Sequence, residues 1–380
     1  MKTIKNRKVA VVGAGPGGLT LATLLQQHGV DVKVYERDEN KNARAKGATL
    51  DLHEESGLRA IREAGLLDAF WGNYRPGADK LRVMDKNAKI VFDDDVHGQE
   101  DRSRPEIDRG PLQTILLESL MAGTVIWNRQ LVSLSPNNSG WRLEFKNGDY
   151  AEADLVVAAD GANSKIRSYI TPIKPFYCGI TVIEGAVKQS EITIPEMHKL
   201  LNGGKIFAMG NEQSLIVSSK GDGSLVFYIG FKKDENWSKE NGLNFSDKGQ
   251  IITWFKEEYD GWDEIWLQLF ENSEYFVERP QYCMPLDQTW KALPNLTMLG
   301  DAAHLMPPYA GEGVNMAMLD ALELSICLLS EDFPNLESAI EKYEIQMRKR
   351  ASDTAKMTLE STDSLHSDNA ISFLLDILAN

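Results

Sequence analysis

The 380-residue sequence predicts an α/β fold in which a parallel-sheet domain is interrupted by an antiparallel-sheet domain and followed by C-terminal helices. Three observations predict this class. A glycine-rich turn separates a short β-branched run from a helix near the N-terminus, the middle of the chain has the pattern of a β-meander, and residues 336–378 follow the helical period.

The N-terminal segment has the pattern of strand, turn, helix and strand. Residues 9–12 form a short β-branched run of the kind that a parallel sheet buries on both faces. A turn over residues 13–18 and a helix over residues 19–28 follow, and Gly29 stands where a helix end favours glycine. The second strand is expected over residues 30–35.

The remaining elements divide between two sheets and two helices. Residues 153–159 and 296–299 are further buried-strand candidates, whereas 205–209, 214–218 and 224–231 predict a meander with glycine-containing turns. A long helix over residues 336–366 is predicted by apolar side chains at helical spacing, namely Leu336, Ile340, Tyr343 and Met347. A shorter helix is expected over 371–378. We therefore expect a discontinuous nucleotide-binding domain (1–172 and 280–335), an inserted substrate domain (173–279) and C-terminal helices (336–380).

Composition narrows the possible functions. Lys and Arg number 41 against 56 Asp and Glu, and the net charge of −15 gives an acidic surface that repels nucleic acid. The three cysteines and six histidines show no metal-type spacing, so we expect no metal site. No segment approaches the roughly 20 apolar residues of a membrane span, and the first residues do not resemble a signal peptide. We expect a cytoplasmic monomer without nucleic-acid or membrane partners.

The turn over residues 13–18 carries the pattern G-x-G-x-x-G between a strand and a helix, as dinucleotide binding requires. Gly13 permits the tight turn, Gly15 lets a pyrophosphate approach the backbone, and Gly18 lets helix and strand pack closely. The helix N-terminus presents free N–H groups to the anion. Glu36 follows Gly18 by 18 residues, where its carboxylate can accept the hydroxyls of an adenosine ribose. The turn therefore predicts NAD or FAD rather than NADP, because the 2′-phosphate of NADP would meet the negative charge of Glu36.

Two later motifs favour FAD. An Asp-Gly pair that begins with Asp160 follows one predicted strand, and a Gly-Asp pair that ends in Asp301 follows another. Asp301 can accept a hydrogen bond from a ribityl hydroxyl. A helix starts just after this motif, and its first main-chain N–H groups can reach the flavin pyrimidine ring, from Gly313, Val314 and Asn315. Either aspartate alone would be a turn former, but the three motifs in this order predict an FAD-binding Rossmann-type domain of the glutathione reductase-like kind.

In these motifs the sequence resembles the FAD-dependent aromatic hydroxylases of the p-hydroxybenzoate hydroxylase group, over nearly the whole chain. It is still more similar to the tetracycline-inactivating flavin monooxygenases, the tetracycline destructases. The stretches that carry this closer resemblance are residues 24–27, 34–38, 49–53, 105–109, 124–127 and 300–308. The resemblance implies a monooxygenase that uses FAD, NADPH or NADH, and O₂ to hydroxylate a planar polycyclic or phenolic substrate through a C4a-hydroperoxyflavin. Tetracycline is the leading candidate.

The resemblance also assigns cofactor contacts. It implies a nicotinamide-nucleotide contact at Arg44, and FAD contacts at Glu36, Arg37, Asp51, Arg109 and Asp301. A solvated surface charge is the alternative for Arg37 and Arg44, and a turn or cap is the alternative for Asp51. A guanidinium at Arg109 would also offset cofactor charge in an acidic protein.

The substrate positions depart from the destructases, which place Gln, Arg and His on the sheet to bind the polar edge of tetracycline. The corresponding residues here are Glu184, Lys205 and Val226. Val226 cannot replace the hydrogen bond of an imidazole, so tetracycline binding either fails or occurs in another way. Glu184 and Lys205 can alternatively be charges of the sheet surface.

In this family the flavin carries the chemistry, so the protein positions the substrate and excludes water, which would release H₂O₂ without hydroxylation. We expect the loop after Asp301 to line a reaction chamber, through Met306, Pro308, Tyr309 and Gly311. Sheet residues are expected to form its apolar floor, with core packing as the alternative, namely Phe207, Met209 and Phe227. Tyr309 would present an aromatic face to the substrate, and His304 is expected to pack the loop rather than act as an acid or base.

Other functions share these motifs. A halogenase or flavin reductase of the same fold is disfavoured, because none of the eight tryptophans stands in the W-x-W-x-I-P setting of the halogenases. A hydroxylase of an unrelated small aromatic metabolite stays open, as does a protein that sequesters a flavin or drug without turnover.

Overall fold

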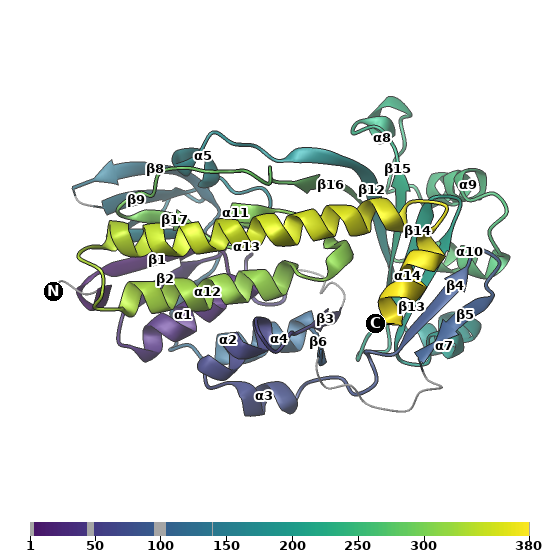
Figure 1. The fold of residues 1–380 in the computed structure, drawn as a ribbon, viewed down its shortest axis with the longest axis horizontal. Helices are drawn as coiled ribbons and strands as arrows, with labels where there is room; N and C mark the ends of the chain where they lie inside the picture. Colours follow the sequence, from purple (N-terminus) through teal and green to yellow (C-terminus); the bar gives the residue numbers. More distant parts are fainter. Residues whose placement is uncertain (1–3, 44–48, 95–103, 139, 380) are drawn as a thin grey trace.

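The computed structural model describes residues 4–43, 49–94, 104–138 and 140–379. Its two main layers are a five-stranded parallel sheet and a seven-stranded, mainly antiparallel sheet, which lie toward opposite ends of the molecule (Figure 1). Long helices run between them. The predicted fold class is confirmed.

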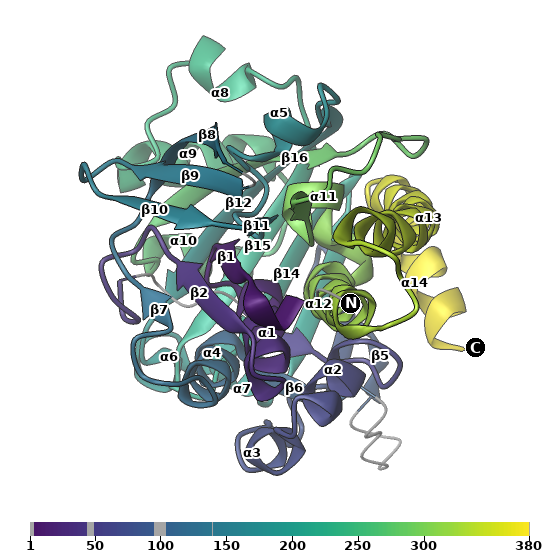
Figure 2. The same ribbon diagram turned by 90° about the vertical axis from the view of Figure 1, so that its left-hand side faces the viewer.

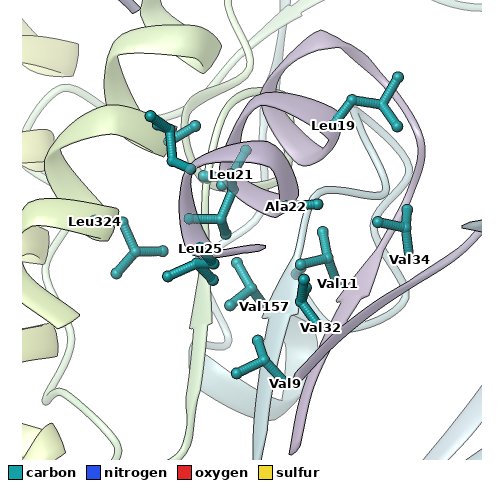
Figure 3. Packing of buried hydrophobic residues seen from close by; sticks show 14 of the residues in the cluster. Val9, Val11, Leu19, Leu21, Ala22, Leu25, Val32, Val34, Val157 and Leu324 are labelled. Carbon is teal, nitrogen blue, oxygen red and sulfur yellow. The ribbon is translucent and has the colours of Figure 1, made fainter. Parts of the chain in front are cut away.

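The parallel sheet has the strand order β17-β11-β1-β2-β7. Its members are β1 (Lys8–Val12), β2 (Asp31–Tyr35), β7 (Val125–Ile126), β11 (Leu155–Ala158) and β17 (Leu296–Met298). Helix α1 (Pro16–Gln27) connects β1 to β2 and packs against α12 (Gly313–Leu329). Figure 3 shows apolar side chains of α1 gathered between the valines of the sheet and Leu324 of α12. Helix α1 begins three residues earlier than predicted, because Pro16 is well suited to a first helical turn.

The large sheet has the strand order β16-β12-β15-β14-β13-β4-β5. Its strands are β4 (Leu81–Asp85), β5 (Ile90–Asp93), β12 (Phe176–Val187), β13 (Lys205–Gly210), β14 (Gln213–Ser219), β15 (Leu225–Lys232) and β16 (Phe276–Cys283). The predicted meander corresponds to β13, β14 and β15. Strands β4 and β5 precede residue 173, so the sheet also draws on chain outside 173–279, and β4 pairs with β13 in parallel.

One face of the large sheet is covered by helices that surround a core rich in aromatic residues. The covering helices are α6 (Ser190–Thr193), α7 (Pro195–Leu201), α8 (Trp237–Glu240), α9 (Lys248–Glu258) and α10 (Glu264–Glu271). Phe227 of β15 packs here against Phe270 and Phe276, with ring centroids 5.2 and 6.4 Å apart.

Smaller sheets and short helices complete the fold. Strand β3 (Thr49–Asp51) pairs with β6 (Glu106–Asp108), and β8 (Leu131–Asn137), β9 (Gly140–Phe145) and β10 (Tyr150–Ala153) form a separate antiparallel sheet. The short helices of this part are η1 (Ile4–Asn6), α2 (Gly57–Glu63), α3 (Leu67–Trp71), α4 (Arg109–Glu118) and α5 (Arg167–Ile170).

Residues 301–378 close the molecule. After α11 (Asp301–His304) and the 3₁₀ helix η3 (Pro308–Ala310), α12 and α13 (Leu336–Leu365) lie side by side near the parallel sheet (Figure 2). Helix α13 spans 30 residues and reaches the large sheet, where α14 (Ala370–Leu378) contacts β13 and β4. Both helices agree with the prediction to within one residue. None of the helices in the described parts of the chain has the length and apolarity that a membrane crossing requires.

Candidate functional site

The glycine-rich turn is closed by protein at two glycines and open at the third. Gly13 has φ +110°, and a Cβ there would lie 2.2 Å from the carbonyl oxygen of Ala159. A Cβ on Gly18 would lie 2.1 Å from the carbonyl oxygen of Gly13. A Cβ on Gly15 would meet no described heavy atom within 4 Å. Open space therefore faces the N-terminus of α1 where the pyrophosphate is predicted.

Glu36 borders this turn with a fixed carboxylate. The residue is buried, and its Oε2 accepts a 2.7 Å hydrogen bond from the Ala14 N–H, while Oε1 accepts one of 3.0 Å from Asp38 N–H. Arg37 follows with an exposed side chain. The predicted contacts of both residues to the cofactor stay predictions, and Arg44 lies outside the described residues.

Arg167 joins the two aspartate motifs. The guanidinium is buried and donates to the carbonyl oxygens of Ala162 (3.0 Å), Asp301 (2.7 Å) and Ala302 (2.7 Å). The sequence analysis missed this role, although Arg167 follows the Asp-Gly motif by only a few residues. The clamp fixes the position of the Asp301 backbone relative to the end of β11.

The surroundings of the two motif aspartates raise the pKa of both carboxyl groups. Burial raises the pKa of Asp160, and its buried Oδ1 has no hydrogen-bond partner within the described chain. Asp301 is solvent-exposed, yet the surrounding protein raises its pKa against the opposing charges of His304, Arg109 and Arg167. Arg109 at the start of α4 is therefore close enough to act on the Asp301 charge.

These groups fit FAD. A Cβ on Gly313 would meet no described atom within 4 Å, and no side chain caps the N-terminus of α12, so main-chain N–H groups are presented to open space there. A carboxylate at Asp301 and a guanidinium at Arg109 suit hydroxyl and phosphate groups. The individual contacts of Gly313, Val314 and Asn315 to the flavin stay predictions.

Asn315 also has a structural role that the sequence did not reveal. Its Oδ1 accepts hydrogen bonds from the N–H groups of His53 (2.9 Å) and Gly57 (3.3 Å), and its Nδ2 donates to the Asp51 carbonyl oxygen (2.9 Å). The fully buried side chain therefore ties the start of α12 to the segment between β3 and α2.

His53 lies between two carboxylates at this junction and was not singled out from the sequence. Its Nε2 is 3.0 Å from Asp51 Oδ2, and its Nδ1 is 3.4 Å from Glu312 Oε1. Burial opposes the imidazolium, but these two partners raise the pKa of His53 to about 9. Although burial opposes the charged form of Asp51 too, His53 and Lys205 keep its pKa below the usual range. The only sequence signal for His53 was its place in the family-like stretch 49–53.

The four predicted substrate residues share one face of the large sheet. Lys205 stands opposite Ser218, which stands opposite Val226. Phe207 stands opposite Ile216, and the same row continues through Tyr228 to Glu184. Since directly opposed residues point to the same side of a sheet, these side chains lie together. Phe227 points to the opposite side, so its expected place in the chamber floor is wrong, because side chains alternate along a strand.

Tyr309 of η3 contacts this same face, which we therefore call the Tyr309 face (Glu184, Lys205, Phe207, Met209, Val226 and Gly230). Tyr309 and Phe207 both pack against the apolar cluster that contains Met209, and the Tyr309 hydroxyl lies 3.3 Å from His366 Nε2. A Cβ on Gly230 would lie 2.4 Å from the Tyr309 hydroxyl, so only glycine leaves room for it. Pro308 and Gly311 beside Tyr309 are exposed.

Two residues of the Tyr309 face already have ionic partners. The Lys205 ammonium pairs with the buried carboxylate of Glu106 on β6. Glu184 accepts hydrogen bonds from the Tyr275 hydroxyl (2.9 Å) and from Arg279 Nε (2.6 Å). Val226 is buried. Roles in substrate binding stay predictions for these positions and for Phe207.

His304 is buried behind the Asp301 loop. Its Nε2 lies 2.5 Å from Asp320 Oδ2, and Asp320 also accepts hydrogen bonds from Gly300 N–H (2.9 Å) and Arg350 (2.7 Å). Asp320 and Asp301 raise the pKa of His304 in spite of its burial and of the opposing charge of Arg350. The network packs the loop, as the sequence analysis expected. The described residues contain no cluster of three or more His, Cys, Asp or Glu side chains that could hold a metal ion.

Comparison with known proteins supports this assignment. The family model described as "FAD binding domain" matches residues 6–177 and 293–358. Monooxygenase asqM of Emericella nidulans is 28% identical over 98% of both chains, and 6-hydroxynicotinate 3-monooxygenase of Pseudomonas fluorescens is 26% identical over 93% of this chain and 91% of its own. The crystal structure of tetracycline destructase Tet(55) has a TM-score of 0.78 at 18% identity, covers 99% of this chain and 95% of its own, and shows a shared fold.

The family match covers the glycine turn, both aspartate motifs and the helices that close the parallel sheet. Both relatives are named as monooxygenases, and this chain matches them over nearly their whole length. The chain therefore belongs to the FAD binding domain family and is a flavin-dependent monooxygenase of the aromatic hydroxylase type, with FAD as cofactor and NAD(P)H as co-substrate.

Proposed function

We propose that this monooxygenase hydroxylates a planar polycyclic or phenolic substrate bound on the Tyr309 face, and that tetracyclines are its leading candidate substrates. The observation that carries the proposal is that Tyr309 and Phe207 both pack against one apolar cluster, which contains Met209. The loop that follows Asp301 and the sheet residues meet at this cluster. A planar substrate bound there would touch the flavin loop and the sheet at once.

The residues of the chain would orient the substrate and keep water away from it. Bound FAD supplies the redox chemistry with O₂. Phe207, Met209 and Val226 offer apolar contacts to an aromatic ring, and the desolvation that they provide favours oxygen transfer over peroxide release.

Lys205 would provide the cation of the site. Its side chain is 23% exposed, and the partner Glu106 fixes the ammonium on the Tyr309 face. An ammonium beside a phenol or enol favours the ionised form of that group, which is richer in electrons and reacts faster with an electrophilic oxygen. We therefore propose substrates with an acidic hydroxyl on a planar ring.

Tetracyclines meet this description but would bind differently here than a His-containing site binds them. Val226 offers no hydrogen bond, and Glu184 is already bound to Tyr275 and Arg279. Lys205 and the apolar side chains would then carry most of the contact. Smaller hydroxylated aromatics fit the same groups, so the substrate test includes both classes.

Oxygen uptake by the purified flavoprotein tests the proposal. NADPH and NADH oxidation is followed with a tetracycline, with simple phenols and with 6-hydroxynicotinate, and products are weighed by mass spectrometry. A product heavier by one oxygen supports the proposal. Oxidation that yields only H₂O₂ with every compound refutes it, and stoichiometric binding without turnover indicates sequestration.

Two variants test the assignment of the face. Val226→His should increase tetracycline turnover, with Val226→Leu as the matched control that keeps an apolar side chain. Lys205→Gln should raise the KM of phenolic substrates about tenfold or more, as expected when one charge-assisted hydrogen bond of about 1.5–3 kcal/mol is lost. Unchanged kinetics in both variants would show that the substrate binds elsewhere.

A further inference from the structure

Two cysteines lie where the chain enters and leaves the large sheet. Cys178 is near the start of β12, which follows the parallel-sheet part of the chain, and Cys283 ends β16, which leads back to β17. Strands β12 and β16 are neighbours in the sheet. The pair therefore lies on two of the strands that connect the sheet to the FAD-binding part.

The pairing of these strands brings the two thiols close together. Phe176 stands opposite Cys283 and Tyr177 opposite Tyr282, but the next pair is Thr181 with Pro280. The bulge contains Gly179 with φ +80°, and beside it Cys178 packs against the apolar cluster that contains Cys283, near enough for each thiol to shift the pKa of the other. Cys283 is buried, whereas Cys178 is partly exposed to solvent.

The cysteine pair is packed behind the flavin loop. Cys178 and Cys283 share an apolar cluster with Met306, and with Ala355 and Leu359 of α13. The Met284 N–H donates to the Leu305 carbonyl oxygen (2.8 Å), which fixes the end of β16 to the segment that precedes Tyr309. A covalent change at the pair would therefore act on the strand connection and on the support of this loop.

The proximity of the thiols also prepares them for oxidation. Cys178 lowers the pKa of Cys283, whereas Cys283 and burial raise the pKa of Cys178. The thiolate is the form of cysteine that reacts with peroxides, and a second thiol in contact can resolve the oxidised product.

We propose that Cys178 and Cys283 form a redox-active dithiol, which hydrogen peroxide converts to an intramolecular disulfide between β12 and β16. One thiolate attacks the peroxide and becomes a sulfenic acid with release of water, and the second thiol displaces a second water to form the S–S bond. Two thiols and one H₂O₂ thus give one disulfide and two H₂O. A flavin monooxygenase supplies this oxidant itself, because without substrate NAD(P)H, H⁺ and O₂ give NAD(P)⁺ and H₂O₂.

Thiol counting on the FAD-loaded full chain tests the proposal. The reduced protein has three cysteines. After exposure to NAD(P)H and air without substrate, one titratable thiol should remain in denaturant, catalase should prevent the loss, and dithiothreitol should restore it. Peptide mapping should join Cys178 to Cys283 within one chain. The disulfide closes a loop of about 100 residues, so the Tm should rise by several degrees and fall again on reduction.

Matched variants separate this disulfide from general oxidation. Cys327 lies on α12 in a different buried cluster, so Cys327→Ser should still lose two thiols to peroxide. Cys178→Ser and Cys283→Ala should keep both remaining thiols and show no oxidation-dependent rise in Tm. Three free thiols in oxidised wild type, a bond to Cys327, a cross-link between chains, or a sulfinic acid at Cys178 without a disulfide would each overturn the proposal. Should Cys283→Ala fail to fold, the half-exposed Cys178→Ser and the peptide map still decide.

Discussion

Two buried histidines show how surroundings set the charge of one residue type. His53 lies between Asp51 and Glu312 and is held as an imidazolium. His366 donates from Nδ1 to the Thr362 carbonyl oxygen (2.7 Å) and faces the Ser214 hydroxyl (3.1 Å) with Nε2, and burial keeps it neutral with a pKa lowered to about 4. Protonation of His366 should therefore destabilise the protein in acid, and loss of the His53 proton should destabilise it in alkali.

His366 should make the protein less stable in acid. Its folded pKa of about 4 lies below the unfolded value of about 6.5, so the unfolded chain binds the proton more strongly between these pH values. Stability should fall as pH drops from 6.5 to 4, by about 3 kcal/mol at most. Urea unfolding from pH 7 to 4 measures this. His366→Gln should flatten the acid slope and the exposed His28→Gln should not, whereas equal slopes in all three proteins would contradict the assignment.

His53 should have the reverse effect. Its folded pKa of about 9 exceeds the unfolded value of about 6.5, so its stabilisation is complete below pH 6.5 and is lost as pH rises through 9. The urea midpoint of the wild type should fall between pH 6.5 and 9.5, and His53→Gln should remove most of that fall. A variant with the full alkaline slope would show that His53 is neutral in the folded protein.

Arg167 should support cofactor binding through the backbone that it clamps. Arg167→Met leaves three carbonyl oxygens without their charged donor. We expect a loss of about 2–4 kcal/mol in unfolding free energy, and FAD binding weaker by about tenfold or more. Fluorescence titration of the apoprotein with FAD measures the second effect. Arg62→Met, which removes an exposed guanidinium paired with Glu54, is the control and should change neither quantity.

At the scale of elements, one ion pair connects the large sheet to the small β3–β6 sheet. Lys205 on β13 pairs with Glu106 on β6, and burial raises the pKa of Glu106. Lys205→Met should cost about 3–5 kcal/mol of unfolding free energy at pH 8, because a buried carboxylate loses its partner. The cost should shrink as the pH falls, because the raised pKa of Glu106 favours its neutral form.

A double-mutant cycle isolates this pair from general packing damage. Lys205→Met with Glu106→Gln should recover most of the loss, because no charge then remains buried. Chemical denaturation of the four proteins gives the coupling energy. Additive effects of the two substitutions would mean that β13 and β6 are held together by other contacts.

Elements whose formation depends on residues close together in the sequence were predictable. The βαβ unit, the meander and both C-terminal helices follow from local spacing of glycine and apolar residues. The addition of β4 and β5 to the large sheet was not predictable, because nothing in residues 81–93 specifies a partner strand some 120 residues later. The same limit applies at the site. The glycine turn and Asp301 were found from motifs, whereas His53 with Glu312 and Arg167 with Asp301 meet only in the folded chain.

At the scale of the whole molecule, α13 and α14 stabilise different sheets. The Tyr343 hydroxyl of α13 donates to the Met298 carbonyl oxygen (3.0 Å), and Glu344 accepts from Thr297 (2.8 Å), so α13 completes the parallel sheet at β17. Helix α14 contacts β4 and β13 of the large sheet and packs near Tyr309.

Truncation should separate these tasks. A chain ending at residue 335 should fail to fold or to retain flavin, whereas one ending at residue 368 should stay yellow but lose substrate-stimulated NAD(P)H oxidation relative to its basal rate. Flavin absorbance and oxygen uptake measure the two properties. Full substrate response in the chain that ends at residue 368 would show that α14 does not close the Tyr309 face.

The order β17-β11-β1 has a consequence for biosynthesis. Strands β1 and β11 have left the ribosome well before β17 and α12, which come after the whole large sheet. At 5–20 residues per second, the apolar edge of β11 and the flank of α1 wait on the order of 10 s for their partners. The nascent chain exposes this apolar surface throughout the delay. Its yield in a cell should therefore depend on chaperones that bind the incompletely folded N-terminal segment.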